Sequence, residues 1–193
     1  MEDSLKKVRV EVSARHVHLS QADQDKLFGP GHQMNVIKDL SQHGQWAAQE
    51  TVTVRGPKGE LKLRNLGPCR KQTQVELART DCFTLGVKAE LRLSGDLKGT
   101  PGCKVIGPKG EVDLAEGCIV PLRHIHISDK QAGERGLTNG DKVRLRVAGP
   151  RGIVFEEVNI RVHPTFDLAC HLDTDEGNAV WADIKGAEGE IIS

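Results

Sequence analysis

The chain has 193 residues, of which 37% are hydrophobic, which is enough for one large domain or two small ones with a real core. Its 27 basic and 27 acidic residues cancel, aromatic residues make up only 3%, and tyrosine is absent, so we exclude nucleic acid as a partner. No apolar run approaches the roughly 20 residues of a membrane span and the polar start lacks a signal-peptide core, so we expect a cytoplasmic protein with no membrane partner.

Short β-branched runs, separated by glycine and proline, predict strands that are buried on one face. In chain order these runs cover residues 8–12, 51–55, 60–64, 104–106, 142–147 and 157–162. Between them lie three Gly-Pro-(Lys or Arg)-Gly segments, at 56–59, 107–110 and 149–152, whose composition favours tight hairpin turns. Two short helices are expected after Ser20 and Ser128, because serine is a favourable N-cap and Gln131 completes a capping box with Ser128.

A duplicated hexapeptide organises the chain. Residues 15–20 read Arg-His-Val-His-Leu-Ser, and residues 123–128 read Arg-His-Ile-His-Ile-Ser. In each half the hexapeptide precedes a predicted helix, and a strand, a glycine-proline turn and another strand follow. The repetition predicts a mainly β fold of two related small β-barrel domains with a few short helices, covering residues 1–97 and 98–193. We leave open an exchange of strands between the halves, and we expect the active site at their interface.

The histidines of the hexapeptides predict metal binding. In a strand, residues i and i+2 lie on the same side about 6.5 Å apart, so both histidines of a pair can bind one ion. A single His-x-His pair more often consists of packed or exposed histidines than of metal ligands. Two such pairs in matching hexapeptides favour metal binding. Aligning the halves adds one ligand to each pair. The first trio is then His16, His18 and Glu76, and the second trio is His124, His126 and His171.

Arg70 is a candidate for binding an oxyanion beside the first trio. It lies six residues before Glu76, so in an extended segment both side chains point the same way. The planar fork of a guanidinium matches two oxygens of a phosphate group. The residues alone leave open a second interpretation, in which Arg70 is a solvated cation at a turn.

Several segments together resemble the PduL-type phosphotransacylases (phosphate propanoyltransferases). They are the two hexapeptides, Lys-Asp-Leu-Ser at 38–41, Leu-Gly-Pro-Cys-Arg-Lys-Gln-Thr-Gln-Val-Glu at 66–76, and Arg-Thr-Asp at 79–81. The resemblance implies two β-barrel domains, two Zn²⁺ ions held by the two trios, and transfer of a short acyl group, propanoyl or acetyl, between CoA and inorganic phosphate. It also implies that Arg70 binds the phosphate, which attacks the thioester directly.

The same resemblance implies further contacts and partners. CoA would contact Val12, Ser13, Ala14, Lys38, Arg64, Leu66 and Asn178. The resemblance leaves open whether the chain forms a homo-oligomer and whether it has lumen partners in a bacterial microcompartment for propanediol degradation. Family members in microcompartments carry a longer targeting extension, whereas only about seven polar residues precede the first strand here. Two other hypotheses remain: a zinc-dependent hydrolase that uses metal-bound water, and a non-enzymatic metal-binding β-barrel module.

Overall fold

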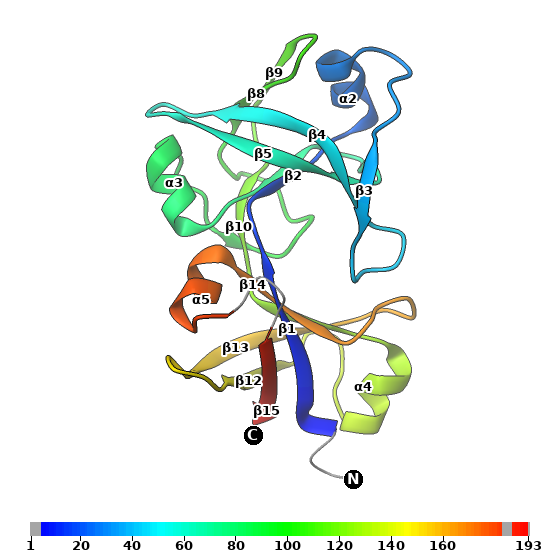
Figure 1. Cartoon of the computed structure of the whole chain (residues 1–193), viewed down its shortest axis with the longest axis vertical. Coiled ribbons are helices and arrows are strands. Elements are labelled where there is room, and N and C mark those ends of the chain that lie inside the picture. The colour runs from blue at the N-terminus through cyan, green and yellow to red at the C-terminus, as the bar shows by residue number, and fades with distance from the viewer. Residues whose placement is uncertain (1–4, 183–186, 193) are drawn as a thin grey trace. The chain divides into compact units, whose positions relative to one another are not determined.

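The computed structural model describes residues 5–182 and 187–192 (Figure 1). Its backbone contacts divide the chain into two compact units. The barrel unit contains the described residues of Met1–Ser13, Ser41–His43 and Leu122–Ser193, and the curled-sheet unit contains Ala14–Leu40 and Gly44–Pro121. Residues 98–121, which the sequence analysis assigned to the second half, therefore lie in the same unit as the first hexapeptide.

The curled-sheet unit is built on a nine-stranded sheet in the order β7-β10-β6-β2-β5-β4-β8-β9, with β3 paired to β4. The strands are β2 (His16–His18), β3 (Val36–Asp39), β4 (Trp46–Arg55), β5 (Glu60–Gly67), β6 (Gln74–Glu76), β7 (Leu91–Arg92), β8 (Cys103–Ile106), β9 (Glu111–Leu114) and β10 (Cys118–Pro121). Helices α2 (Gln21–Phe28) and α3 (Arg79–Leu85) accompany them. Val17, Leu63 and Val75, from three neighbouring strands, are at most 1% exposed and lie in one apolar core.

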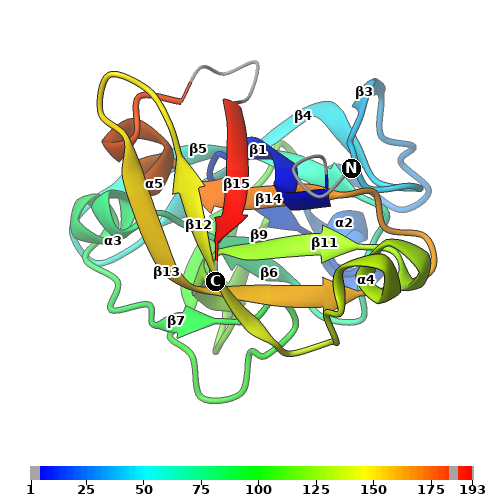
Figure 2. The same cartoon turned by 90° about the horizontal axis from the view of Figure 1, so that it is seen from below.

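The barrel unit closes six strands in the order β1-β14-β11-β13-β12-β15, and β15 pairs back to β1 (Figure 2). The strands are β1 (Lys7–Ser13), β11 (His124–Ile127), β12 (Lys142–Val147), β13 (Ile153–Val162), β14 (Ala169–Asp173) and β15 (Ala187–Ile192). Helices α4 (Asp129–Arg135) and α5 (Thr174–Ala179) belong to this unit. Because β1 comes from the start of the chain, the barrel closes only with a strand from the N-terminal half.

The mainly β architecture with a few short helices is confirmed. The three glycine-proline turns connect β4 to β5, β8 to β9 and β12 to β13, as the sequence predicts. Strands β4 and β13 begin four or more residues earlier than predicted, because irregularities break their period-two alternation. The register of β4 shifts between Ala47 and Thr51, and in β13 Glu157 has a φ of 56°.

Both hexapeptides end in the same helix cap. Ser20 Oγ accepts a hydrogen bond from the Asp23 N–H at 3.1 Å, and Ser128 Oγ accepts one from the Gln131 N–H at 3.3 Å. The two serines share a φ of −74°, with ψ values of 157° and 159°. The predicted helices α2 and α4 are therefore confirmed, together with their start residues.

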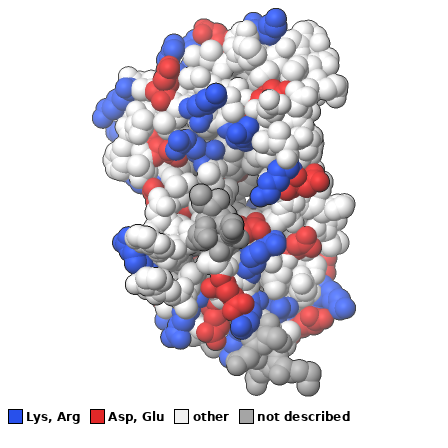
Figure 3. Space-filling model, in the orientation of Figure 1, with Lys and Arg blue, Asp and Glu red and all other residues white. Residues whose placement is uncertain are grey.

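Charges of both signs share the surface. On the face drawn in Figure 3, lysine and arginine side chains lie among aspartate and glutamate side chains. Every helix in the described part of the chain falls short of the length and apolar character that crossing a membrane requires.

Candidate metal centre and anion site

Strand β2 presents both histidines of the first trio on one side of the sheet. His16 and His18 are separated by Val17, which points the other way into the core and is fully buried. The two histidines are themselves only 6% and 2% exposed. Fully buried imidazoles need polar partners, so the surroundings of this pair decide what it can bind.

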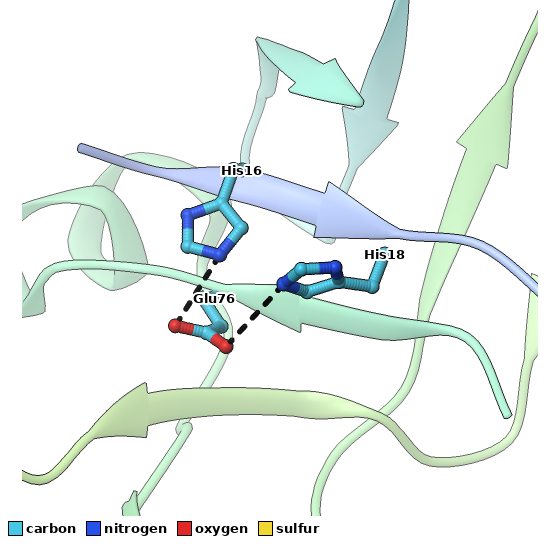
Figure 4. A group of neighbouring side chains, drawn as sticks. All are labelled: His16, His18 and Glu76. Atoms are coloured by element: carbon cyan, nitrogen blue, oxygen red, sulfur yellow. Dashed lines mark ion pairs between the residues drawn. The ribbon is translucent and has the colours of Figure 1, made fainter. Parts of the chain in front are cut away.

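Glu76 is brought to the pair by strand register. Strand β6 runs antiparallel to β2, and Glu76 lies directly opposite His16. Its Oε2 is 3.4 Å from His16 Nε2, and its Oε1 is 4.0 Å from His18 Nε2 (Figure 4). The three side chains converge on one point from two adjacent strands.

The electrostatics of the first trio favour a charged His16–Glu76 pair beside a neutral His18. Burial alone would raise the pKa of Glu76, but His16, His18 and the Arg70 guanidinium hold that pKa well below its usual range. Burial lowers the pKa of His16, but the Glu76 carboxylate outweighs burial, so this pKa is raised. Burial, with the charges of His16 and Arg70, lowers the pKa of His18 well below its usual value.

Arg70 reaches the same group of side chains. One terminal guanidinium nitrogen lies 2.8 Å from His18 Nε2, and the other donates to Ser94 Oγ at 2.8 Å. Ser94 Oγ also accepts from Gln74 Nε2 at 2.9 Å and donates to Glu76 Oε1 at 3.3 Å. The segment from Arg70 to Glu76 is not one extended strand, since residues 71–73 bend away from strand geometry before β6 begins.

Ser94 and Gln74 were not singled out from the sequence. Gln74 faces His18 across the β2–β6 ladder, and its side-chain amide is nearly fully buried. The signal that could have pointed to Gln74 is its spacing of two from Glu76, which puts both side chains on one side of β6. Ser94 follows β7 in a loop, and no local pattern marks it.

The second trio repeats the arrangement of the first in the barrel unit. His124 and His126 lie on β11, and His171 lies opposite His124 on the antiparallel strand β14. The ring centroids are separated by 4.5 Å for His124 and His126, 4.8 Å for His126 and His171, and 5.3 Å for His124 and His171. Each trio thus takes its third ligand from the residue that faces the first histidine across an antiparallel ladder.

The backbone fixes the ring orientation of the first histidine in each pair. His16 Nδ1 lies 2.8 Å from the carbonyl oxygen of Ala14, and His124 Nδ1 lies 2.7 Å from that of Leu122. In each case Nδ1 must carry the proton to donate this bond, so in the neutral form of the ring the lone pair is on Nε2. Nε2 is therefore the atom that can bind a metal.

The first trio has the spacing for a metal ion, and the second has suitable donor atoms. Ligand atoms about 2.0–2.1 Å from a tetrahedral ion lie roughly 3.3 Å apart. In the first trio all three ligand atoms lie within 4.8 Å of one another, and among the residues that the structure describes no other three His, Cys, Asp or Glu side chains approach so closely. The second trio offers three neighbouring imidazoles as metal ligands, and the Nε2 atoms of His126 and His171 are buried.

The arginine of each hexapeptide stabilises the scaffold. Arg15 donates to Asp81 Oδ1 at 2.8 Å, and Arg123 donates to Glu176 Oε1 at 2.8 Å. Each acidic residue is the third residue of the helix that follows β6 or β14. Asp81 accepts a hydrogen bond from the N–H of the N-cap residue Ala78 at 3.0 Å, and Glu176 forms a capping box with the N-cap residue Asp173. The arginines thus tie the histidine strands to α3 and α5.

The residues expected to contact CoA fall into two groups, one in each unit. In the curled-sheet unit Lys38 pairs with Ala47, and Ala47 pairs with Leu66, so these residues form one row across β3, β4 and β5. Arg64 lies on β5 beside His16 and donates to the carbonyl oxygens of Ala48 and Gln49, each at 2.9 Å. Ala14, which is exposed, begins this unit.

In the barrel unit, Val12 and Ser13 end β1, and Asn178 lies exposed on α5. Helix α5 packs on Val12, since a Cβ on Gly177 would come within 2.6 Å of its side chain.

A separate cavity of about 560 Å³ lies in the curled-sheet unit, with Phe28, His32 and Glu50 among its lining residues. None of its lining residues belongs to the trios or to the expected CoA contacts.

A family model described as phosphate propanoyltransferase matches residues 9–183. The phosphate propanoyltransferase of Citrobacter rodentium (strain ICC168) is 52% identical over 178 residues, which cover 91% of this chain and 84% of the relative. That of Thermotoga maritima is 51% identical over 172 residues, covering 88% and 82%. That of Salmonella typhimurium (strain LT2) is 49% identical over 183 residues, covering 94% and 87%. The similarity therefore extends through both units.

Proposed function

The chain belongs to the phosphate propanoyltransferase family, and from that premise we propose that it transfers a propanoyl or acetyl group between CoA and inorganic phosphate at two zinc ions. Acyl-CoA and phosphate give acyl phosphate and free CoA, and the reaction is reversible. The chain is thus a phosphotransacylase whose substrates are a short acyl-CoA and phosphate.

The observation that carries the proposal is the Arg70 guanidinium against the buried first trio, 2.8 Å from His18 Nε2. A fixed cation beside a set of three metal ligands suits an anionic substrate with tetrahedral oxygens. The bond from Arg70 to Ser94 holds the guanidinium in place before the substrate arrives. Such preorganisation spares the reaction the cost of ordering the side chain.

The reaction needs no covalent intermediate on the protein. A phosphate oxygen attacks the carbonyl carbon of the thioester, a C–O bond forms, the C–S bond breaks, and CoA leaves as the thiolate. Arg70 neutralises charge on the phosphate and fixes its direction of attack. Zinc ions bound by the two trios would supply polarisation of the carbonyl and stabilisation of the thiolate.

Arg70 and a metal ion would use the same atom of His18, Nε2. A neutral imidazole has one acceptor lone pair, and Arg70 lies against it at His18 Nε2. With a metal ion held at this nitrogen, one guanidinium N–H group of Arg70 would lose His18 as its acceptor. That N–H group would then donate to phosphate, so a metal ion at the first trio would favour phosphate binding at Arg70.

The predicted CoA contacts, the location of the active site and the assembly of the chain belong to this proposal as well. Lys38 and Arg64 would bind phosphate groups of CoA, while Leu66, Asn178 and residues 12–14 would contact the rest of the molecule. The placement of the active site between the two halves stays a prediction. So do oligomer formation and a cytoplasmic or microcompartment location.

The test is release of free thiol from acetyl-CoA and propanoyl-CoA, measured with and without phosphate, on zinc-loaded and chelator-treated protein. Release that needs both phosphate and metal supports the proposal, and the ratio of the two rates gives the acyl preference. Metal-dependent release that ignores phosphate would identify a hydrolase instead. Bound metal without release of thiol from either substrate would leave only a metal-binding module.

A further inference from the structure

We propose that Glu11 and Gln42 are positioning residues of the second trio, which orient His171 and His126 so that each presents Nε2 to the metal ion. The inference rests on the zinc-binding part of the proposed function. Neither residue belongs to a motif in the sequence. Both come from the N-terminal half of the chain, while all three ligands come from the C-terminal half.

Glu11 reaches His171 across the barrel. Strands β1 and β14 run parallel, and Glu11 is the register partner of His171. Glu11 Oε2 lies 3.8 Å from His171 Nδ1 and accepts a 2.6 Å hydrogen bond from Ser41 Oγ. The other oxygen pairs with Arg9 Nε at 2.8 Å. The carboxylate is therefore held from both sides and faces the ring nitrogen opposite to Nε2.

Gln42 performs the equivalent task at His126. Gln42 Nε2 lies 2.5 Å from His126 Nδ1, and a rotation of the amide by 180° brings its oxygen to the same place. An imidazole that binds a metal through Nε2 carries its proton on Nδ1, so the amide oxygen of Gln42 must be the atom that faces the ring. Residues 41–43 belong to the barrel unit, although the rest of the connection from β3 to β4 belongs to the curled-sheet unit.

With these contacts, every Nδ1 atom of the second trio faces a protein group. The carbonyl oxygen of Leu122 lies 2.7 Å from His124 Nδ1, Gln42 faces that of His126, and Glu11 faces that of His171. Metal-binding histidines nearly always donate their other ring N–H to a carbonyl, carboxylate or water, which fixes the tautomer and makes the ligand nitrogen more basic. The second trio has hydrogen-bond partners within 2.7 Å at His124 and His126, and at His171 the Glu11 carboxylate lies 3.8 Å away, within ion-pair distance.

The charge of the second trio gives Glu11 an additional role. The first trio contains the Glu76 carboxylate, which offsets part of the charge of a divalent ion. The second trio consists of three imidazoles, so an ion there would keep its full charge. The Glu11 carboxylate beside His171 supplies the nearby negative charge that the ligands themselves lack.

The test isolates the second trio and measures its zinc affinity directly. A His16→Gln background removes the first trio, so that one zinc ion per chain remains to be titrated against a chromophoric chelator. In this background we expect Glu11→Gln and Gln42→Ala each to raise the dissociation constant roughly 10- to 100-fold, the usual effect of losing such a partner. Cobalt substitution should show a changed visible spectrum in the same variants.

The matched control is Glu50→Gln. Glu50 also contacts a histidine, with Oε1 3.0 Å from His32 Nε2, but this pair lies in the curled-sheet unit outside both trios. Its substitution should leave zinc affinity unchanged. Wild-type affinity in both Glu11→Gln and Gln42→Ala would overturn the inference. Absence of zinc from the unaltered protein would instead contradict the proposed function. Gln42→Ala, in a three-residue connection, keeps the test valid if Glu11→Gln does not fold.

Discussion

Replacement of Arg70 by alanine should selectively weaken the use of phosphate. The guanidinium contacts His18 Nε2 and Ser94 Oγ, both at 2.8 Å, so it is held in one place beside the first trio. A hydrogen bond to a charged group contributes about 1.5–3 kcal/mol. At about 1.4 kcal/mol for each factor of ten, loss of one such bond to phosphate lowers kcat/KM for phosphate roughly 10- to 150-fold.

The assay is thiol release at varied phosphate with saturating acyl-CoA, and then at varied acyl-CoA with saturating phosphate. We expect the loss in the first series to exceed the loss in the second. Arg70→Lys should fall between wild type and Arg70→Ala, because an ammonium keeps the charge but loses the planar fork. Lys71→Ala, at the exposed neighbouring position, is the control and should behave as wild type.

Zinc content must be measured alongside the kinetics, since Arg70 contacts a predicted ligand. If Arg70→Ala retains its zinc and its kcat/KM for phosphate equals that of wild type, the assignment of Arg70 to phosphate is wrong. A parallel loss for both substrates with loss of zinc would mean that Arg70 supports the first trio and does not bind the substrate.

Further predictions concern metal and stability. In the proposed function zinc binds the folded chain, so chelation should abolish phosphate-dependent thiol release and lower the Tm, and added zinc should restore both. Burial raises the pKa of Asp173 to about 6 from an ordinary value of 3.8, so its ionised form destabilises the fold. In metal-free protein Asp173→Asn should leave stability unchanged below pH 3.8, where both states are protonated. The gain should then grow with rising pH up to about 6 and stay level above it, reaching about 1 kcal/mol after allowance for solvent screening. A flat difference in Tm between pH 4 and pH 8 would contradict this reasoning. Gly133→Ala, on exposed α4 with open space at the Cβ position, should stabilise by about 0.5–1 kcal/mol in denaturant unfolding. Gly102→Ala should destabilise by about 1–3 kcal/mol in the same measurement, because its Cβ would lie 1.8 Å from the Leu114 carbonyl oxygen.

Local features of the fold were predictable because they depend on a few neighbouring residues. The Ser20 and Ser128 caps and the three glycine-proline turns follow from side-chain and backbone preferences at single positions. The first and last residues of the strands were harder to predict from the sequence. The irregularity near Glu157 interrupts the alternation on which the prediction relied, so the first residues of β13 were missed.

The candidate site was predictable to the extent that the chain repeats itself. Duplication of the hexapeptide pointed to both histidine pairs, and alignment of the halves suggested Glu76 and His171, which the structure places directly opposite His16 and His124. The supporting side chains have no such repeat.

The sequence by itself determined several strands, the turns, the helix caps and which residues make up the two trios, because each follows from short-range periodicity or from the duplication. Only the tertiary structure decided that β1 closes the barrel against β14 and β15, and that Glu11 faces His171. These pairings join segments more than a hundred residues apart. Their register is set by which faces of distant strands bury apolar side chains together, and a shift of one residue would turn every side chain to the opposite face.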